Sequence, residues 1–285
     1  MKLHWILPLG ILVVPVTLAA LAGGCSTNPV TGKKQLILIS TEQEVALGAD
    51  AAPQFEDEFG GLVGDAELQA YVRNIGSRLA DHSDRKDVQY EFALLASDIP
   101  NAFALPGGKV YVTAGLMVLM TNERQLAGVL GHEITHVAAK HNVMGMQRQM
   151  GAAVLVELAG YAAGSDKAKA AEAATQIASG MVNLKYGRDD EYQADQYGCK
   201  YMAKAGYNPW GVVELLEVLK SLHDNEPGSL GELFQTHPIT SKRIERARGI
   251  VQSEYPQYSP ESPDPNAGRF IKMRDKLPPH IKKHG

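Results

Sequence analysis

The feature that most constrains this chain is the run His-Glu-Ile-Thr-His at residues 132–136, which lies within a helical repeat of apolar residues. The repeat extends from about 121 to 142, so a helix is predicted over that segment. Residues four apart share one face of a helix, so His132 and His136 can reach one metal ion. The run predicts a catalytic zinc site, with one ion per chain and Glu133 beside the metal-bound water as the general base.

The third metal ligand is expected from an acidic segment further along the chain. Glu191 and Asp195 lie four apart in a predicted helix over 188–205, so both carboxylates project from one face. Catalytic zinc suits two imidazoles and one carboxylate, and a second carboxylate often orients a ligand imidazole. We therefore assign Glu191 to the metal and Asp195 to a ligand histidine. The alternative is a solvated acidic face, which is the commoner interpretation where no histidine pair is present.

His141 is the rival for the third ligand position. A His-Glu-x-x-His-x-x-Gly-x-x-His site needs glycine at position 139 and histidine at position 142, whereas this chain has Ala139 and Asn142. An uninterrupted helix would also turn His141 away from the metal. We predict instead that His141 lies at the C-terminal end of the helix and contacts terminal carbonyls or a carboxylate.

The N-terminus has the pattern of an export signal that ends in a lipid attachment site. An uncharged stretch follows Lys2 and ends in Leu-Ala-Gly-Gly before Cys25. These features predict a lipoprotein signal peptide over residues 1–25, a lipid anchor on Cys25 and a periplasmic location, and Ser26 favours the outer membrane. The alternative is an uncleaved membrane helix, because the apolar stretch approaches the roughly 20 residues that a span requires.

The remaining chain predicts one α+β domain, mainly helical, with a small sheet. Residues 26–35 are polar, so a tether is expected over 26–39, and residues 40–251 are expected to form the zinc-binding domain. Residues 252–285, rich in Pro and Ser at their start, are expected to form a tail that lies along the surface or is disordered.

Local patterns predict the elements of the domain. Residues 88–96 are strand-like and 101–113 are typical of a hairpin. The Ala-rich segment 151–180 is expected to be helical and to flank or cover the site, and whether it acts as a lid stays open. Further helices are predicted after Ser40, after Asp65, over 188–205 and from Asn208 to about Leu222.

Composition limits the partners. With 45% hydrophobic and 21% charged residues, the chain can bury a substantial core. The net charge of -4, with basic and acidic residues interleaved, offers no field for a polyanion, so nucleic acid is not an expected partner. Cys199 is the only cysteine after Cys25, so no intramolecular disulfide is expected, and Cys199 is expected to be a buried helix residue rather than a reactive thiol.

Four segments together resemble the CAAX-protease/HtpX-type zinc metallopeptidases, and they are 101–108, 132–141, 191–195 and 236–238. A further segment, 28–36, looks like the periplasmic lipoprotein branch of that family, represented by LoiP and BepA. The resemblance implies a zincin-like fold of the gluzincin type. It also implies cleavage of polypeptides in the bacterial envelope, namely misfolded or misassembled periplasmic and outer-membrane proteins, with outer-membrane assembly proteins as possible partners.

The resemblance also implies roles for residues outside the two helices. Asn101 and Ala102, on a strand edge, are expected to hold an extended substrate. His237 is expected near the zinc, either to stabilise the oxyanion or to occupy the fourth ligand position. The alternative for His237 is a capping or turn residue before Pro238. Arg243 is expected to pair with an active-site carboxylate.

Two other functions stay open at this point. One is an envelope chaperone or assembly factor whose zinc site is structural or latent, with His237 as a fourth ligand. The other is hydrolysis of a non-protein amide such as a cell-wall peptide. The intact Glu133 argues against a purely structural site, which has no use for a base.

Overall fold

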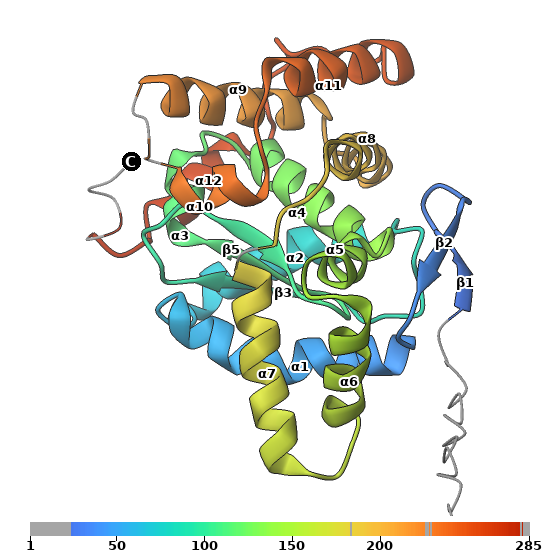
Figure 1. Ribbon diagram of the computed structural model, residues 1–285. Coiled ribbons are helices and arrows are strands. Elements are labelled where there is room, and N and C mark those ends of the chain that lie inside the picture. The colour runs from blue at the N-terminus through green and yellow to red at the C-terminus, as the bar shows by residue number, and fades with distance from the viewer. Residues whose placement is uncertain (1–23, 183, 226–227, 229, 280, 282–285) are drawn as a thin grey trace, which may run out of the picture.

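The computed structural model describes residues 24–285 except 183, 226–227, 229, 280 and 282–285 (Figure 1). Within that part the chain is mainly helical with two small sheets, which confirms the predicted class. In chain order the elements are β1 (Gly24–Thr27), β2 (Lys34–Ile37), α1 (Thr41–Glu58), α2 (Ala66–Ala80), β3 (Glu91–Leu95), β4 (Ala102–Ala104), β5 (Lys109–Thr113), α3 (Ala114–Leu119), α4 (Glu123–Ala138), α5 (His141–Gln149), α6 (Ala152–Ala162), α7 (Lys167–Val182), α8 (Arg188–Lys204), α9 (Trp210–Asn225), α10 (Gly231–Thr236), α11 (Ser241–Glu254) and α12 (Ala267–Arg274).

The larger sheet has the strand order β3-β5-β4. Its central strand, β5, runs parallel to β3 and antiparallel to β4. The turn between β4 and β5 contains Gly107 and Gly108 with φ of 82° and 112°, a conformation that favours glycine. The predicted strand and hairpin are therefore confirmed. β4 lies at the edge of the sheet, and β5 is the strand it pairs with among the described residues.

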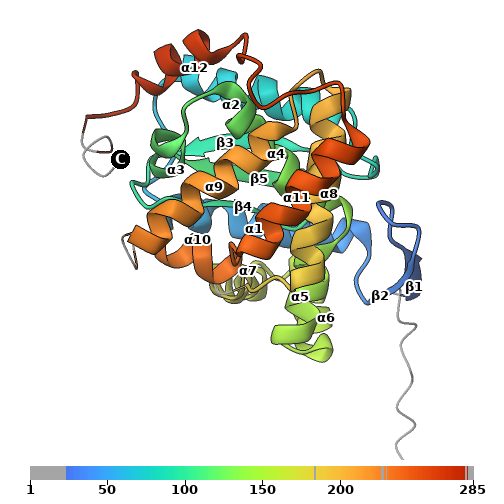
Figure 2. The same cartoon turned by 90° about the horizontal axis from the view of Figure 1, so that it is seen from above.

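Helix α4, which carries the His-Glu-x-x-His run, lies in the interior of the protein, and all its residues are buried. Helices α8, α9 and α11 lie over it when the molecule is seen from above (Figure 2). Two glycines allow α4 and α8 to approach closely. A Cβ added at Gly131 would lie 3.1 Å from the Gly198 backbone oxygen, and one at Gly198 would lie 3.1 Å from the His132 nitrogen.

Helix α4 ends earlier than predicted. Lys140 adopts a left-handed conformation with φ of 60°, so α4 stops at Ala138 and α5 starts at His141. The prediction of one helix from about 121 to 142 is therefore wrong at its C-terminal end, and so is the placement of His141 at a helix C-terminus. Lysine carries no glycine-like signal for this conformation.

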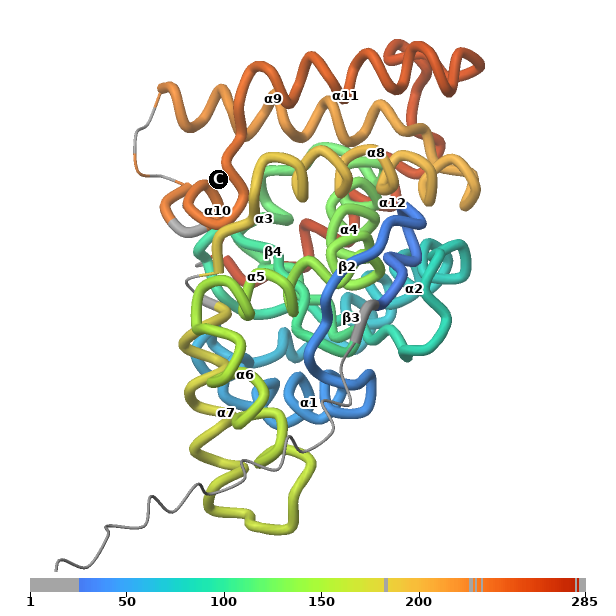
Figure 3. Tube along the Cα trace, turned by 45° about the vertical axis from the view of Figure 1, so that its right-hand side comes forward, coloured from blue at the N-terminus to red at the C-terminus, as the bar shows by residue number. Residues whose placement is uncertain are grey.

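The Ala-rich segment 151–180 forms the antiparallel pair α6 and α7, which packs against α1. Leu155, Ala173 and Ile177 are fully buried between these helices and their neighbours. The pair lies at the opposite end of the molecule from α9 and α11 (Figure 3). The segment is therefore helical, as predicted, and most of it packs away from α4.

The predicted tether over 26–39 is wrong. Strands β1 and β2 pair antiparallel, and their hairpin packs on the C-terminal end of α4. The side-chain amides of Asn28 and Gln35 donate to the Ala139 carbonyl over 3.4 and 3.5 Å, and Val30 is buried. The hairpin supplies partners for a carbonyl that the helix end leaves unpaired, which the polar composition alone did not indicate. Of the predicted signal peptide, residues 1–23 lie outside the described residues.

The tail prediction for 252–285 is also wrong in part. Helix α12 and the residues after it bury an apolar stripe with helical spacing in the main core: Phe270, Met273, Leu277 and Ile281. The Arg124 guanidinium donates to the Ser262 carbonyl over 2.7 Å and holds the preceding loop. The Pro- and Ser-rich start of the segment concealed this stripe. No helix within the described residues is both long enough and apolar enough to cross a membrane.

Candidate metal centre

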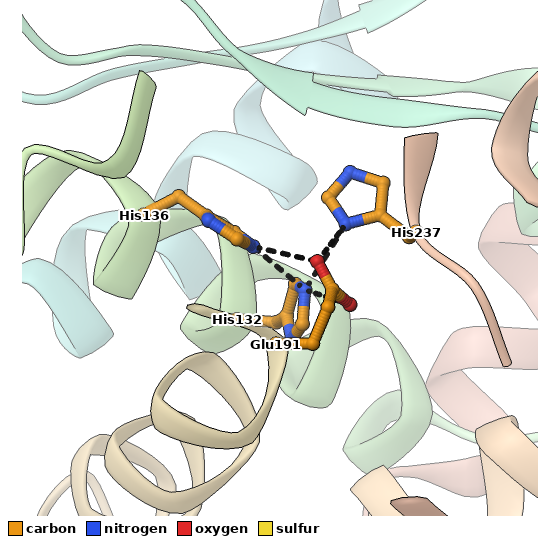
Figure 4. Close-up of side chains that lie close together, drawn as sticks. All are labelled: His132, His136, Glu191 and His237. Carbon is orange, nitrogen blue, oxygen red and sulfur yellow. Dashed lines mark hydrogen bonds and ion pairs between the residues drawn. The ribbon is translucent and has the colours of Figure 1, made fainter. Parts of the chain in front are cut away.

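Four buried side chains meet where α4 and α8 face the segment after α10. They are His132 and His136 from α4, Glu191 from the first turn of α8 and His237 at the end of α10 (Figure 4). One ligand atom from each of them lies within 4.8 Å of the others. Among the described residues this is the group of histidines and acids suited to a metal ion.

The spacing of the ligand atoms fits a tetrahedral metal. Zinc–ligand distances of about 2.0–2.2 Å imply separations of roughly 3.3–3.6 Å between ligand atoms. The Nε2 atoms of His132 and His136 lie 3.0 Å apart. Glu191 lies 3.6 Å from His132 Nε2 through Oε2 and 3.4 Å from His136 Nε2 through Oε1. The three residues predicted as ligands therefore form a set that one ion can fill with small adjustments.

The ring of His132 is oriented by a carboxylate and an arginine. Asp195 Oδ1 lies 3.0 Å from His132 Nδ1, so the Nδ1 proton can be donated to it and Nε2 is left to face the cluster. Arg243 donates to both Asp195 oxygens, over 2.6 and 2.8 Å, and also pairs with Glu191. Asp195 therefore contacts His132, and Arg243 pairs with the Asp195 and Glu191 carboxylates, which are the contacts that the sequence predicted for these side chains.

His136 has different neighbours. Nδ1 of His141 lies 3.1 Å from its Nδ1, and the Tyr186 ring packs on it with centroids 3.9 Å apart. Neither residue was predicted to contact the site. A histidine five positions after a ligand points away in a regular helix, and Tyr186 belongs to the loop before α8, so local spacing indicated neither.

Glu133 faces the cluster with its charge poorly compensated. The side chain is 2% exposed, and its Oε2 has no hydrogen-bond partner among the described residues. His237 Nε2 lies 3.8 Å from its Oε1. Burial raises the pKa of the Glu133 carboxyl above its ordinary value. A buried carboxylate oxygen without a hydrogen-bond partner is costly, so its presence beside the four clustered side chains indicates a function.

The protonation states suit metal binding. Burial lowers the pKa of His136 well below its usual value, so its ring is neutral. Burial acts to raise the pKa of Glu191, but Arg243 and His237 outweigh this and hold it well below the usual range. His136 and Glu191 therefore offer a neutral imidazole nitrogen and an ionised carboxylate oxygen, the forms that coordinate a cation.

An apolar cavity adjoins the cluster. Its polar wall includes His132, Glu133 and His237, and the rest is formed mainly by side chains of α4, α9 and the segment around Ile239, with Val129 and Leu216 among them. Ala102 of the edge strand β4 also lines it. The other predicted substrate residue, Asn101, is buried at the start of β4, where its backbone nitrogen donates to the Thr113 hydroxyl over 2.9 Å.

Comparison with known proteins agrees with this geometry. A model of peptidase family M48 matches residues 66–251, from α2 into α11, and so includes all four clustered side chains. The chain is 28% identical over 257 residues to the beta-barrel assembly-enhancing protease of Escherichia coli (strain K12), which is 86% of this chain and 51% of that protein. It therefore spans about half the length of that relative.

Two shorter relatives come from the same organism. Metalloprotease YcaL is 31% identical over 182 residues, covering 64% of this chain and 69% of YcaL. Metalloprotease LoiP is 26% identical over 250 residues, covering 85% of this chain and 97% of LoiP. Since the family model spans more than half of the chain and all of the cluster, the chain belongs to peptidase family M48.

Proposed function

We propose that this protein is a zinc-dependent endopeptidase in which His132, His136 and Glu191 bind the metal. The observation that carries the proposal is the meeting of these three donors with a buried Glu133 carboxylate, whose Oε2 has no hydrogen-bond partner among the described residues. A purely structural site has no use for such a group. Membership of a peptidase family supports the same activity.

Zinc, when bound, would polarise the scissile carbonyl and acidify a water molecule. Glu133 accepts the proton of the attacking water and later passes it to the leaving amine. Burial raises the pKa of Glu133, which makes its carboxylate a stronger base toward the attacking water. Asp195 and Arg243 keep the His132 ring in the orientation that directs Nε2 to the cluster.

His237 has two candidate roles. Its Nδ1 lies 3.4 Å from His132 Nε2 and 2.9 Å from Glu191 Oε1, a position that suits a fourth ligand. Its Nε2 lies on the side of Glu133, where a donor would stabilise the oxyanion. Burial acts to lower the pKa of His237, but Glu191 and Glu133 outweigh this and raise it, which supports a proton-donating role.

The edge strand and the apolar cavity support an extended polypeptide as substrate. Strand β4, which begins at Ala102 directly after Asn101, is an edge strand, and a substrate strand can pair with the outer side of such a strand. The adjoining cavity would accept an apolar side chain next to the scissile bond. Both features favour a protein substrate over a small cell-wall amide.

We further propose that the enzyme acts on misfolded or misassembled envelope proteins. One relative is named for enhancing β-barrel assembly, and two others are named metalloproteases. A lipid anchor on Cys25 would hold the enzyme on the periplasmic side of a membrane, in the outer membrane if Ser26 acts as a sorting residue. Outer-membrane assembly proteins are then the expected partners.

The second candidate is an assembly factor with a latent zinc site. The observation in its favour is His237, because a fourth protein donor beside the three ligands would close the site. Under this alternative the protein binds zinc but does not cleave proteins.

Casein cleavage by the purified chain in detergent tests the activity. We expect cleavage that is lost on chelation and restored by zinc. Cleavage that persists in excess chelator would contradict the proposal. If zinc is bound without cleavage, His237→Ala separates the two candidates, because activity that appears in this variant indicates a latent enzyme and continued inactivity an assembly factor.

A further inference from the structure

The two ligand histidines of α4 are held by different partners, and the partner of His136 is itself a histidine. His132 contacts a carboxylate directly, through Asp195. His136 instead has Nδ1 of His141 at 3.1 Å from its own Nδ1, and both rings are buried. Two facing ring nitrogens can form a hydrogen bond only if one carries the proton and the other does not.

The proposed metal role of His136 determines which nitrogen carries the proton. Its Nε2 faces His132 and Glu191, so this atom must keep its lone pair for the metal. The ring proton is then on Nδ1 and is donated to Nδ1 of His141. His141 must in turn carry its proton on Nε2, and that atom lies 3.7 Å from Asp190 Oδ1, an electrostatic contact rather than a hydrogen bond.

Asp190 is itself held in place. Its Oδ2 accepts hydrogen bonds from the Gly187 backbone nitrogen and from the Arg148 guanidinium, each over 3.0 Å. The series Arg148, Asp190, His141, His136 therefore resembles the series Arg243, Asp195, His132 on the other ligand, with an extra imidazole inserted. Each ligand ring is thus directed by a chain of groups that ends in a carboxylate paired with arginine.

The break between α4 and α5 makes this arrangement possible. In a continuous helix the fifth residue after His136 would point about 140° away from it. The left-handed Lys140 changes the chain direction and returns His141 to the ring. Lys140 is stabilised there by Glu44, 3.6 Å from its Nζ, and the adjacent Ala139 carbonyl accepts from the β1–β2 hairpin. These contacts stabilise the left-handed conformation of Lys140, and this conformation places His141 beside the His136 ring.

We propose that His141 is a positioning residue that holds the His136 imidazole in its metal-binding tautomer and orientation, with Asp190 aligning His141. The inference rests on the proposed metal role of His136. Groups that orient a ligand from outside the coordination shell are typically worth about 10- to 100-fold in metal affinity.

Zinc affinity, measured by competition with a chromophoric chelator, tests this proposal without any assay of activity. His141→Leu fills the space without an acceptor and should weaken zinc binding by about 10- to 100-fold. His141→Asn puts an amide oxygen near the position of Nδ1 and should recover most of that loss. Asp190→Asn should weaken binding by a smaller factor, whereas Asp189→Asn, an exposed neighbour, should leave it unchanged.

Thermal unfolding of the metal-free variants shows whether each one folds. If His141→Leu does not fold, the comparison of Asp190→Asn with Asp189→Asn still tests the proposal. Unchanged affinity in His141→Leu, equal losses in the Leu and Asn variants, or equal affinity in the two Asp variants overturns the role of His141. If the wild-type protein binds no zinc, the proposed function fails instead, and the inference fails with it.

Discussion

Two helix pairs of this protein differ in what their packing achieves. Helices α4 and α8 meet at Gly131 and Gly198, and each brings ionisable side chains into a buried site. Helices α6 and α7 pack through apolar side chains such as Leu155 and Ile177, and no residue of theirs belongs to the metal cluster. Close approach in the first pair brings together donors far apart in sequence, whereas the second pair contributes burial.

The largest difference between the two helix pairs is expected in the cleavage rate, when one carboxylate is removed from each pair. Glu133→Gln should lower the cleavage rate by about 10²- to 10⁴-fold, because the proposed base is lost, while zinc remains bound. Glu157→Gln on α6 changes an exposed carboxylate and should leave the rate unchanged. Steady-state cleavage and zinc content of both variants check this, and more than a tenth of wild-type turnover in Glu133→Gln would overturn its role.

A cavity in the second pair should affect stability without affecting the metal. Leu155 is fully buried, so Leu155→Ala should cost about 2–5 kcal/mol of unfolding free energy. Zinc affinity should stay at the wild-type value. Val154→Ala, at a position 40% exposed on the same helix, is the control and should change stability by less than about 0.5 kcal/mol. Denaturant unfolding and zinc titration measure the two properties. Loss of zinc binding in Leu155→Ala would contradict the view that α6 and α7 contribute stability without affecting the metal site.

A single methyl group added at the contact between α4 and α8 should affect both stability and zinc binding. The Cβ of Gly198→Ala would lie 3.1 Å from the His132 nitrogen, so α4 or α8 must shift by a few tenths of an ångström. We expect a loss of about 1–3 kcal/mol in stability together with weaker zinc binding. Zinc binding of wild-type strength in a destabilised Gly198→Ala would show that the helix spacing does not control the site.

The smallest effect, opposite in sign, is expected in α6. An added Cβ at Gly160 meets no atom within 4 Å, and the residue is helical. Gly160→Ala should therefore stabilise the protein by about 0.4–1 kcal/mol, since the unfolded chain loses conformational freedom. Thermal unfolding of the metal-free protein measures it, and a loss of stability would mean that α6 packs more tightly than the geometry indicates.

The sequence predicted the parts of the site that depend on helical spacing. His132, Glu133 and His136 share one helix, and Glu191 lies one turn before Asp195, so period and chemistry were sufficient to predict that they meet. His141 was misplaced because its position depends on the left-handed conformation of Lys140, a residue without a strong preference for it.

The two ends of the chain were misjudged for a related reason. Polar composition suggested a tether over 26–39, but Asn28 and Gln35 are partners of the Ala139 carbonyl at the end of α4. In the C-terminal segment, the apolar stripe that contains Phe270 follows a Pro- and Ser-rich stretch. Long-range packing of this kind leaves little trace in local composition.

The most direct test of the account is the zinc content of the purified protein after dialysis, by elemental analysis of the wild type, His136→Ala and Glu191→Ala. We expect one zinc per wild-type chain and loss of most of it in both variants, because each removes one of the three proposed ligands. A wild-type protein without zinc, or variants that keep a full equivalent, would contradict the claim that α4 and α8 together build the metal site.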